Sequence, residues 1–316
     1  MSMSGSIMKS ISKSISSMSQ MYNKSSNWAK VMIIVVVLLI VITLFKSATI
    51  KKEGYEQRDK FEFKTGPEIY DDFYATIYDY LVFNSLKTDY EIGEIINKTG
   101  ANETSVVLDI GSGTGHHVAK LSEEGVKNVI GMDISPAMIK EAKSKYPHLD
   151  FRVGDTLDDT QFQSQQFTHI LCLYFTIYYF KDKRRFFQNC MEWLMPGGHL
   201  IVHLVDVEKF DPILPPANPL YIVSPQKYAK ERITKSKIKF DEFEYESNFH
   251  FDKTNSSFNE KIKFNDGRVR KHEQTLYMED TDDILTIAQE CGFIFQGKID
   301  MVNCAYENQY LYIFQK

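Results

Sequence analysis

The chain has 316 residues, more than one average domain needs, and its 43% content of hydrophobic residues is enough to form a packed core. A formal net charge of -5 argues against a nucleic-acid-binding protein, because such proteins usually present a basic surface. The four cysteines form no CxxC pair and have no histidine at zinc-like spacing, so we expect free core thiols and no metal site.

The charge is distributed unevenly along the chain. Residues 1–52 contain seven lysines and no acidic residue, which leaves a formal charge of -12 on the remainder. The first part of this arm, residues 1–27, is rich in serine, methionine and lysine and predicts a polar basic tail, although isoleucines at helical spacing also permit a short interfacial helix. The expected partner of a basic arm beside an apolar segment is an anionic membrane surface.

The apolar segment follows the tail. Residues 31–45 are apolar except for Thr43, and Lys30 and Lys46 bracket them. With its flanks, this segment predicts one transmembrane helix over residues 28–50, and a cleaved signal peptide is the alternative. More basic residues follow the span than precede it, so the positive-inside rule predicts a single-pass membrane protein whose C-terminal domain is cytosolic.

Residues 51–66 are charged and predict a linker, and residues 67–316 predict the main domain. Aromatic and apolar residues at helical spacing over 67–96 indicate one or two helices at its start. Strands then alternate with helices, which predicts a parallel, doubly wound sheet with ligands at the carboxyl ends of its strands. The expected strands are Ser105–Ile110, Asn128–Asp133, Asp150–Gly154, Phe167–Phe175 and His199–Val205. The expected helices between them are His117–Glu124, Pro136–Lys145 and Asp182–Leu194.

The pattern changes between about residues 207 and 280. Prolines interrupt the chain, segments with period-two alternation follow, and Asn265-Asp266-Gly267-Arg268 is a strong hairpin signal. We expect an antiparallel lid insertion over the mouth of the site, then a helix from Thr281 and two closing strands, Phe293–Asp300 and Gln309–Phe314. The predicted fold is therefore α/β, with a doubly wound, seven-stranded, mostly parallel sheet, an antiparallel C-terminal hairpin and an antiparallel β insertion.

A glycine-rich turn follows the first strand of this sheet. Residues 111–115 read Gly-Ser-Gly-Thr-Gly, and glycines allow a backbone to approach a ligand closely. A dinucleotide-binding fingerprint would require glycine at position 116, where the chain has His116, so pyrophosphate binding is disfavoured. Asp133 and Asp155 end the next two strands, and a carboxylate at the first of these positions can accept both hydroxyls of a ribose.

This arrangement resembles motif I and the following acidic motifs of class I, Rossmann-like methyltransferases that depend on S-adenosylmethionine. The resemblance covers residues 67–316 and is most specific over 106–198. It implies S-adenosylmethionine as cofactor, and in-line transfer of its methyl group to an N or O nucleophile of a small molecule. The cofactor-binding residues that it implies are Asp109, Gly111, Ser112, Gly113, Gly115, Asp133, Ile134, Asp155 and Thr156.

The sequence contains fewer indications of the residues that would bind the methyl acceptor. The segment after the fourth strand, residues 174–179, lacks the Asn/Asp-Pro-Pro-Tyr/Phe motif of base and glutamine-amino methyltransferases. His203 near the end of the fifth strand is a candidate general base, and Tyr179 is a candidate acceptor contact. The alternatives are a hydrogen-bonded core histidine and a packed tyrosine. A lipid or quinone-like acceptor, a protein acceptor and a membrane-anchored cofactor-binding scaffold without turnover also stay open.

Overall fold

The computed structural model describes residues 23–49, 61–217, 224–252 and 255–316. The chain divides into two compact units, with the boundary between residues 57 and 58. Residues 1–22 of the predicted tail and residues 51–60 of the predicted linker lie outside the described residues.

The first unit contains helix α2, Asn27–Thr49, which covers most of the segment predicted to cross a membrane. Within the described part of the chain, no helix is both long and apolar enough for a membrane span. The predicted transmembrane helix is therefore not supported, and the cytosolic placement stays a prediction.

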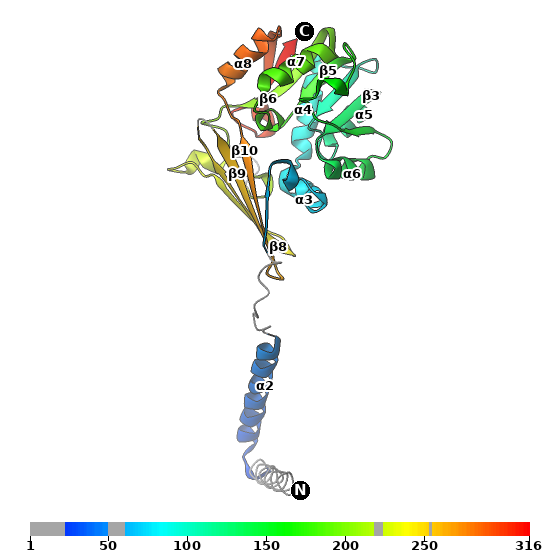
Figure 1. The fold of residues 1–316 in the computed structure, drawn as a ribbon. Coiled ribbons are helices and arrows are strands. Elements are labelled where there is room, and N and C mark those ends of the chain that lie inside the picture. Colours follow the sequence, from blue (N-terminus) through cyan, green and yellow to red (C-terminus); the bar gives the residue numbers. More distant parts are fainter. Residues whose placement is uncertain (1–22, 50–60, 218–223, 253–254) are drawn as a thin grey trace. The chain divides into compact units, whose positions relative to one another are not determined.

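The second unit is built on a seven-stranded sheet with the order β11-β12-β6-β5-β2-β3-β4 (Figure 1). The pairs from β4 through β3, β2 and β5 to β6 are parallel, whereas β12 is antiparallel to both β6 and β11. This arrangement confirms the predicted α/β sheet with its antiparallel C-terminal hairpin. The strands are β2 (Val106–Ile110), β3 (Asn128–Asp133), β4 (Asp150–Val153), β5 (Phe167–Cys172), β6 (Leu194–Val205), β11 (Ile294–Asp300) and β12 (Gln309–Gln315).

Helices cover both faces of this sheet, because neighbouring side chains on each strand point to opposite sides. On β2, Val107 packs in the cluster with α4, α5 and α6, whereas Leu108 packs in the cluster with α7 and α8. Both residues are buried, as expected for a strand covered on two faces. These helices are α4 (Ser85–Thr99), α5 (His116–Glu123), α6 (Pro136–Lys145), α7 (Lys183–Trp193) and α8 (Thr281–Glu290).

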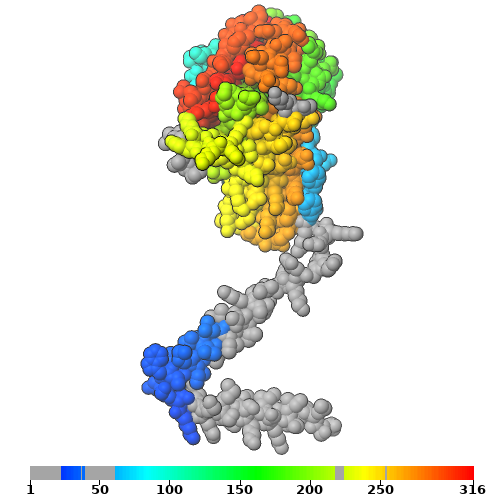
Figure 2. All heavy atoms as spheres, turned by 90° about the vertical axis from the view of Figure 1, so that its left-hand side faces the viewer, coloured from blue at the N-terminus to red at the C-terminus, as the bar shows by residue number. Residues whose placement is uncertain are grey.

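The insertion forms a second sheet with the order β1-β10-β9-β8-β7. It contains the predicted antiparallel strands β8 (Phe243–His250), β9 (Ser256–Phe264) and β10 (Val269–Leu276), and adds β7 (Lys235–Lys239). Strand β1 (Phe61–Thr65) pairs in parallel with β10, although the sequence places residues 61–65 in the linker. Figure 2 shows this edge strand, in blue, beside the orange strand. The sequence contains no turn signal that predicts this pairing, because the two strands lie far apart in the chain.

Helix α3, Asp72–Val82, lies between the second sheet and α6 (Figure 1). Its Tyr74 and Ile77 belong to one buried cluster with Tyr245 of β8, Ile262 of β9 and Met138 of α6. The helix begins after an N-cap aspartate whose side chain accepts a hydrogen bond from the backbone nitrogen of Tyr74. Helix α3 therefore connects the inner face of the insertion to the main domain.

The burial of β2 on both faces predicts that truncation of a leucine on this strand destabilises the domain far more than truncation of an exposed leucine. Replacing the fully buried Leu108 with alanine should lower the free energy of unfolding by about 2–5 kcal/mol, because the change leaves a cavity between the sheet and its helices. The matched control is Leu86→Ala on α4, where the leucine is 74% exposed, and its effect should stay within about 0.5 kcal/mol. Urea unfolding of the full chain measures both changes, and equal effects would contradict the packing described here.

Candidate active site

A cavity of about 320 Å³ lies at the carboxyl ends of β2, β3, β4 and β5. Its walls include the glycine-rich loop after β2, the residues that follow the other three strands, and parts of α3 and α4. Its volume lies within the range typical of small-ligand sites, and its position is the usual one in open α/β sheets.

The glycine-rich loop has a backbone conformation that requires glycine. Gly111 has a φ of +69° and Gly115 a φ of +91°, in the left-handed region that side chains disfavour. A Cβ atom on Gly111 would lie 2.6 Å from the side chain of Thr176, and one on Gly115 would lie 2.6 Å from the ring of Phe151. The loop backbone can therefore form the cavity wall at Gly111, and Gly115 can pack tightly as it caps α5.

Asp133 connects the end of β3 to this loop. Its carboxylate accepts hydrogen bonds from the backbone nitrogens of Gly113, at 3.0 Å, and Ser135, at 2.8 Å. Burial raises the pKa of Asp133, and these two hydrogen bonds oppose the shift. Each carboxylate oxygen keeps further acceptor capacity for a ligand hydroxyl, as the predicted ribose contact requires.

The structure brings most of the predicted cofactor-binding residues to one cavity. Its walls contain Gly111, Ser112, Gly113, Asp133, Ile134, Asp155 and Thr156. The hydroxyl of Ser112 is buried and has no hydrogen-bond partner among the described residues, so a ligand can satisfy it. Asp109 and Gly115 do not line the cavity. Asp109 is 1% exposed beneath the loop, and Gly115 is buried against Phe151.

His203 does not reach the cavity, contrary to the position expected of a general base. It is fully buried, its Nδ1 is bonded to the carbonyl oxygen of Tyr174, and its Nε2 lies 3.0 Å from Oε1 of Gln309. Burial lowers the pKa of His203 to about 4, so the ring is neutral at physiological pH. Both ring nitrogens have partners within the protein, so the structure favours the alternative, a hydrogen-bonded core histidine, over a general base.

Tyr179 does line the cavity. Its hydroxyl lies 2.8 Å from the hydroxyl of Tyr70, which precedes α3. Desolvation raises the pKa of Tyr179 to about 12, even though 36% of the residue is exposed. The side chain is therefore protonated at neutral pH, and it can donate a hydrogen bond or position an acceptor.

One residue on α3 and one on α4 also belong to the site, but they lie in no sequence motif, so the sequence did not indicate them. Asp79 on α3 accepts a hydrogen bond from the hydroxyl of Thr114, at 2.6 Å, and its other oxygen lies 2.7 Å from Nε2 of His116. Burial raises the pKa of Asp79, but the hydrogen bonds from His116, Lys145 and Thr114 outweigh it and hold the pKa at about 2. Helix α3 thereby anchors the glycine-rich loop from outside the main sheet.

Lys87 on α4 is the second missed residue. It is buried, donates a hydrogen bond of 2.6 Å to Oε1 of Glu91, and lies 5.0 Å from the ring centre of Tyr174. Burial raises the pKa of Glu91, but Lys87 and His117 outweigh this effect and hold it at about 2. Among the described residues, Lys87 is the one lysine in the cavity wall, and the wall has no arginine.

A second, smaller cavity of about 70 Å³ shares part of its wall with the first. It extends toward the inner face of the second sheet, where Glu260 of β9 and Gln274 of β10 line it. The shared residues are Tyr70, Tyr78, Val82, Tyr174, Phe175, Tyr179 and Gln274. The site therefore has two adjoining compartments, one at the glycine-rich loop and one beneath the insertion.

Comparison with known proteins agrees with this geometry. Residues 107–198 match the model of a methyltransferase domain family. A demethylmenaquinone methyltransferase from Chlorobaculum parvum is 29% identical over 117 residues, which cover 37% of this chain and 46% of that protein. The chain thus spans less than half the length of this curated relative.

Solved structures show the same fold. One is an S-adenosylmethionine-dependent methyltransferase from Clostridium acetobutylicum, with a TM-score of 0.58 and 19% identity over 77% of this chain and 97% of that one. Another is a sugar N-methyltransferase from a Streptoalloteichus species, with a TM-score of 0.55 and 19% identity over 73% and 87%. Residues 107–198 therefore match a methyltransferase domain, and the second unit has the class I, Rossmann-like fold of these structures. Both findings confirm the resemblance of the sequence to methyltransferases that depend on S-adenosylmethionine.

The burial of Asp109 makes the stability of the domain depend on pH. Burial, opposed by His117 and assisted by the nearby charges of Glu91 and Asp133, raises the pKa of Asp109 to about 6. A carboxyl group with a raised pKa in the folded state stabilises fully at low pH, and this contribution is lost as the pH rises through about 6. Relative to the wild type, Asp109→Asn should therefore gain about 2 kcal/mol between about pH 4.5 and pH 7.5.

Urea unfolding of both proteins across this range measures the difference. The control Asp283→Asn, at an exposed position on α8, accounts for the loss of one formal charge. A stability difference between Asp109→Asn and the wild type that does not vary with pH would contradict a buried, ionisable Asp109.

Proposed function

We propose that this protein transfers a methyl group from S-adenosylmethionine to a nitrogen or oxygen atom of a small molecule. The observation that carries the proposal is the junction of the glycine-rich loop and the Asp133 carboxylate at the wall of one cavity, with a second compartment beside it. The unpartnered Ser112 hydroxyl and the lack of room for a Cβ at Gly111 fit a polar ligand held against the loop.

Each part of the first cavity has a role in this proposal. Asp133 would hold the ribose hydroxyls, and Asp155 and Thr156 would frame the adenine. The loop at Gly111 would hold the amino-acid end, and Lys87 would supply a positive charge for its carboxylate. When bound, S-adenosylmethionine supplies a methyl group on a positively charged sulfur, so the chain's own task is to align the acceptor and exclude water. Such alignment can contribute about 7–11 kcal/mol to lowering the barrier.

The second cavity supports a small acceptor. Its volume of about 70 Å³ has room for a few heavy atoms, since one water needs about 10–15 Å³. Tyr179 and Gln274 lie in the walls of both compartments, where the acceptor would meet the methyl group. By their names, two of the proteins compared above act on small molecules, a demethylated menaquinone and a sugar, which agrees with this class of acceptor.

Removal of the Asp133 carboxylate tests the cofactor site. Asp133→Ala should weaken binding of S-adenosylmethionine by at least about 100-fold, because it removes the ribose acceptor and releases the backbone nitrogens of Gly113 and Ser135. Isothermal titration calorimetry measures the change. The matched control is Asp283→Ala on α8, which should leave the affinity unchanged, and an unchanged affinity in Asp133→Ala would contradict the assigned pocket.

Turnover is tested separately from binding. The full chain is incubated with S-adenosylmethionine that carries a radioactive methyl group, together with small-molecule, lipid and protein fractions of a cell extract. The proposal expects label in the small-molecule fraction. Label in the protein fraction alone would indicate a protein methyltransferase, and tight cofactor binding without any labelled acceptor would indicate a scaffold; either outcome would overturn the proposed function.

A further inference from the structure

The second cavity has an unusual balance of charge. Its wall contains the carboxylates of Asp211 and Glu260 and, among the described residues, no lysine, arginine or histidine. Aromatic rings make up much of the rest of the wall, and the face of an aromatic ring attracts a cation. These rings belong to Tyr70, Tyr74, Tyr78, Tyr174, Phe175, Tyr179, Phe210, Phe249, Phe258 and Tyr306. Lys87 already lies over the rings of Tyr174 and Tyr306, and Arg232 over that of Phe210. The remaining rings, together with Glu260, favour a ligand group that is positively charged or becomes so.

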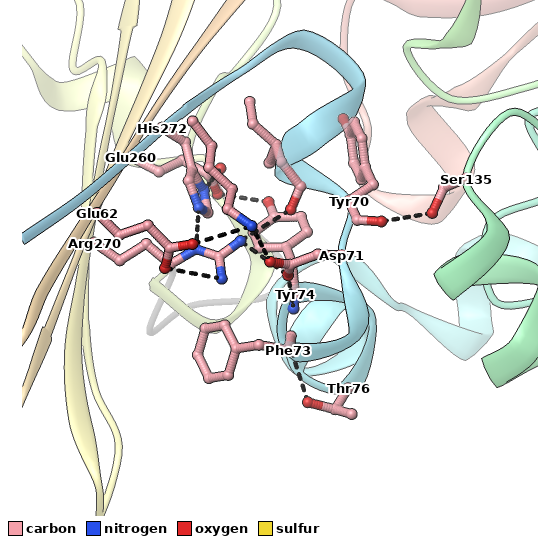
Figure 3. A network of polar contacts seen from close by, with 12 residues as sticks. Glu62, Tyr70, Asp71, Phe73, Tyr74, Thr76, Ser135, Glu260, Arg270 and His272 are labelled. Carbon is pink, nitrogen blue, oxygen red and sulfur yellow. Dashed lines mark hydrogen bonds and ion pairs between the residues drawn. The ribbon is translucent and has the colours of Figure 1, made fainter. Parts of the chain in front are cut away.

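Glu260 is held in place by a buried hydrogen-bond network (Figure 3). Its Oε1 accepts hydrogen bonds from the hydroxyls of Tyr74, at 2.6 Å, and Tyr245, and its Oε2 lies 2.9 Å from Nδ1 of His272. Burial and the negative charge of Glu260 raise the pKa of Tyr74 and Tyr245 well above the usual value, so both hydroxyls keep the protons that they donate. The oxygen of Tyr74, which lines the cavity, is left free to accept a hydrogen bond.

Among the described residues, Glu260 has no lysine or arginine partner of its own. Arg270 donates from Nε to Nε2 of His272, at 2.5 Å, so Nδ1 of this ring carries the proton that points to Glu260. The guanidinium of Arg270 instead pairs with Asp71, at 2.9 Å, and Glu62, at 3.6 Å (Figure 3). Lys64 likewise pairs with Asp71 and Glu62, so neither Arg270 nor Lys64 binds the carboxylate of Glu260.

The side chain of Gln274 gives independent evidence that this cavity binds a ligand with a hydrogen-bond donor. It is 8% exposed, its side chain belongs to the walls of both cavities, and its Oε1 has no hydrogen-bond partner among the described residues. Its amide nitrogen donates to the carbonyl oxygen of Thr275, at 3.2 Å, which orients the amide. A buried acceptor without a donor is costly, so this position calls for an N–H or O–H group of a ligand.

We infer that the acceptor is an amine, whose nitrogen donates a hydrogen bond to Gln274 and lies within the field of Glu260 and the aromatic walls. The inference rests on the proposed methyl transfer and adds the substrate class. The lone pair of the neutral amine forms the C–N bond as the C–S bond breaks and its electrons return to sulfur. Positive charge thus passes from sulfur to nitrogen, and the N–H proton leaves to solvent afterwards. The acidic, aromatic compartment stabilises this developing charge on nitrogen.

The atom that carries the new methyl group tests the inference. The full chain is incubated with S-adenosylmethionine that carries a ¹³C-labelled methyl group and a small-molecule cell extract, and the methylated products are separated from unreacted cofactor. Their ¹H–¹³C NMR spectra and mass spectra after fragmentation distinguish a methyl group on nitrogen, which is the expected result, from one on oxygen or carbon. A methyl group on oxygen or carbon would overturn the amine inference while methyl transfer to a small molecule stands. No labelled product, despite cofactor binding, would instead overturn the proposed function, and the inference with it.

A pair of glutamine variants tests the assigned contact. Gln274→Leu preserves the approximate size of the side chain and should lower kcat/KM for the amine at least about tenfold, because it removes the acceptor oxygen. The affinity for S-adenosylmethionine, measured by calorimetry, should stay unchanged, which a general loss of structure would not allow. Gln289→Leu, at an exposed position on α8, is the control and should retain full activity. Unaltered methylation by Gln274→Leu would contradict the contact.

Discussion

The hydrogen bond from the backbone nitrogen of Gly113 to the carboxylate of Asp133 is the interaction on which the site depends. It joins the turn after β2 to the end of β3, two parallel strands whose register places these ends side by side. The bond forms only because Gly111 and Gly115 adopt left-handed backbone conformations that bring the loop inward. A polar cleft at the edge of a hydrophobic sheet follows from this one junction.

A second set of contacts holds the cleft from the side of the insertion. Asp79 on α3 binds Thr114 and His116 at the far end of the glycine-rich loop, while Tyr74 on the same helix binds Glu260 of the second sheet. Helix α3 is therefore coupled both to the loop and to the insertion. Both contacts are buried or partly buried. A shift of this helix would therefore alter the first and the second cavity together.

The walls of the two cavities differ in charge, and this difference favours the movement of positive charge in one direction across the site. Lys87 is a buried cation in the wall of the first, whereas Glu260 leaves negative charge in the wall of the second. The proposed transfer would move positive charge from the first cavity toward the second, and both groups would favour that movement. The tyrosines between them, including Tyr179 and Tyr70, stay protonated because desolvation raises their pKa values.

The sequence by itself determined the main sheet, because parallel strands buried on both faces are continuous apolar runs and end in recognisable turns. Residues 111–115, Asp133 and Asp155 were identified for the same reason: each lies at or just after the end of a strand, and parallel strands end at one edge. Only the tertiary structure decided which side chains from distant elements line the two cavities. Gln274 and Glu260 line the second cavity from strands of the insertion, and Lys87 lines the first from an ordinary amphipathic helix. Strand β1 joins the second sheet through a pairing with a strand distant in sequence. The same reason explains the prediction for His203. Its position near the end of a strand suggested a general base, and only its contacts with Tyr174 and Gln309 show that it lies in the core. Local spacing encodes which residues follow a strand, but which side chains meet across a cavity depends on packing between elements distant in the chain.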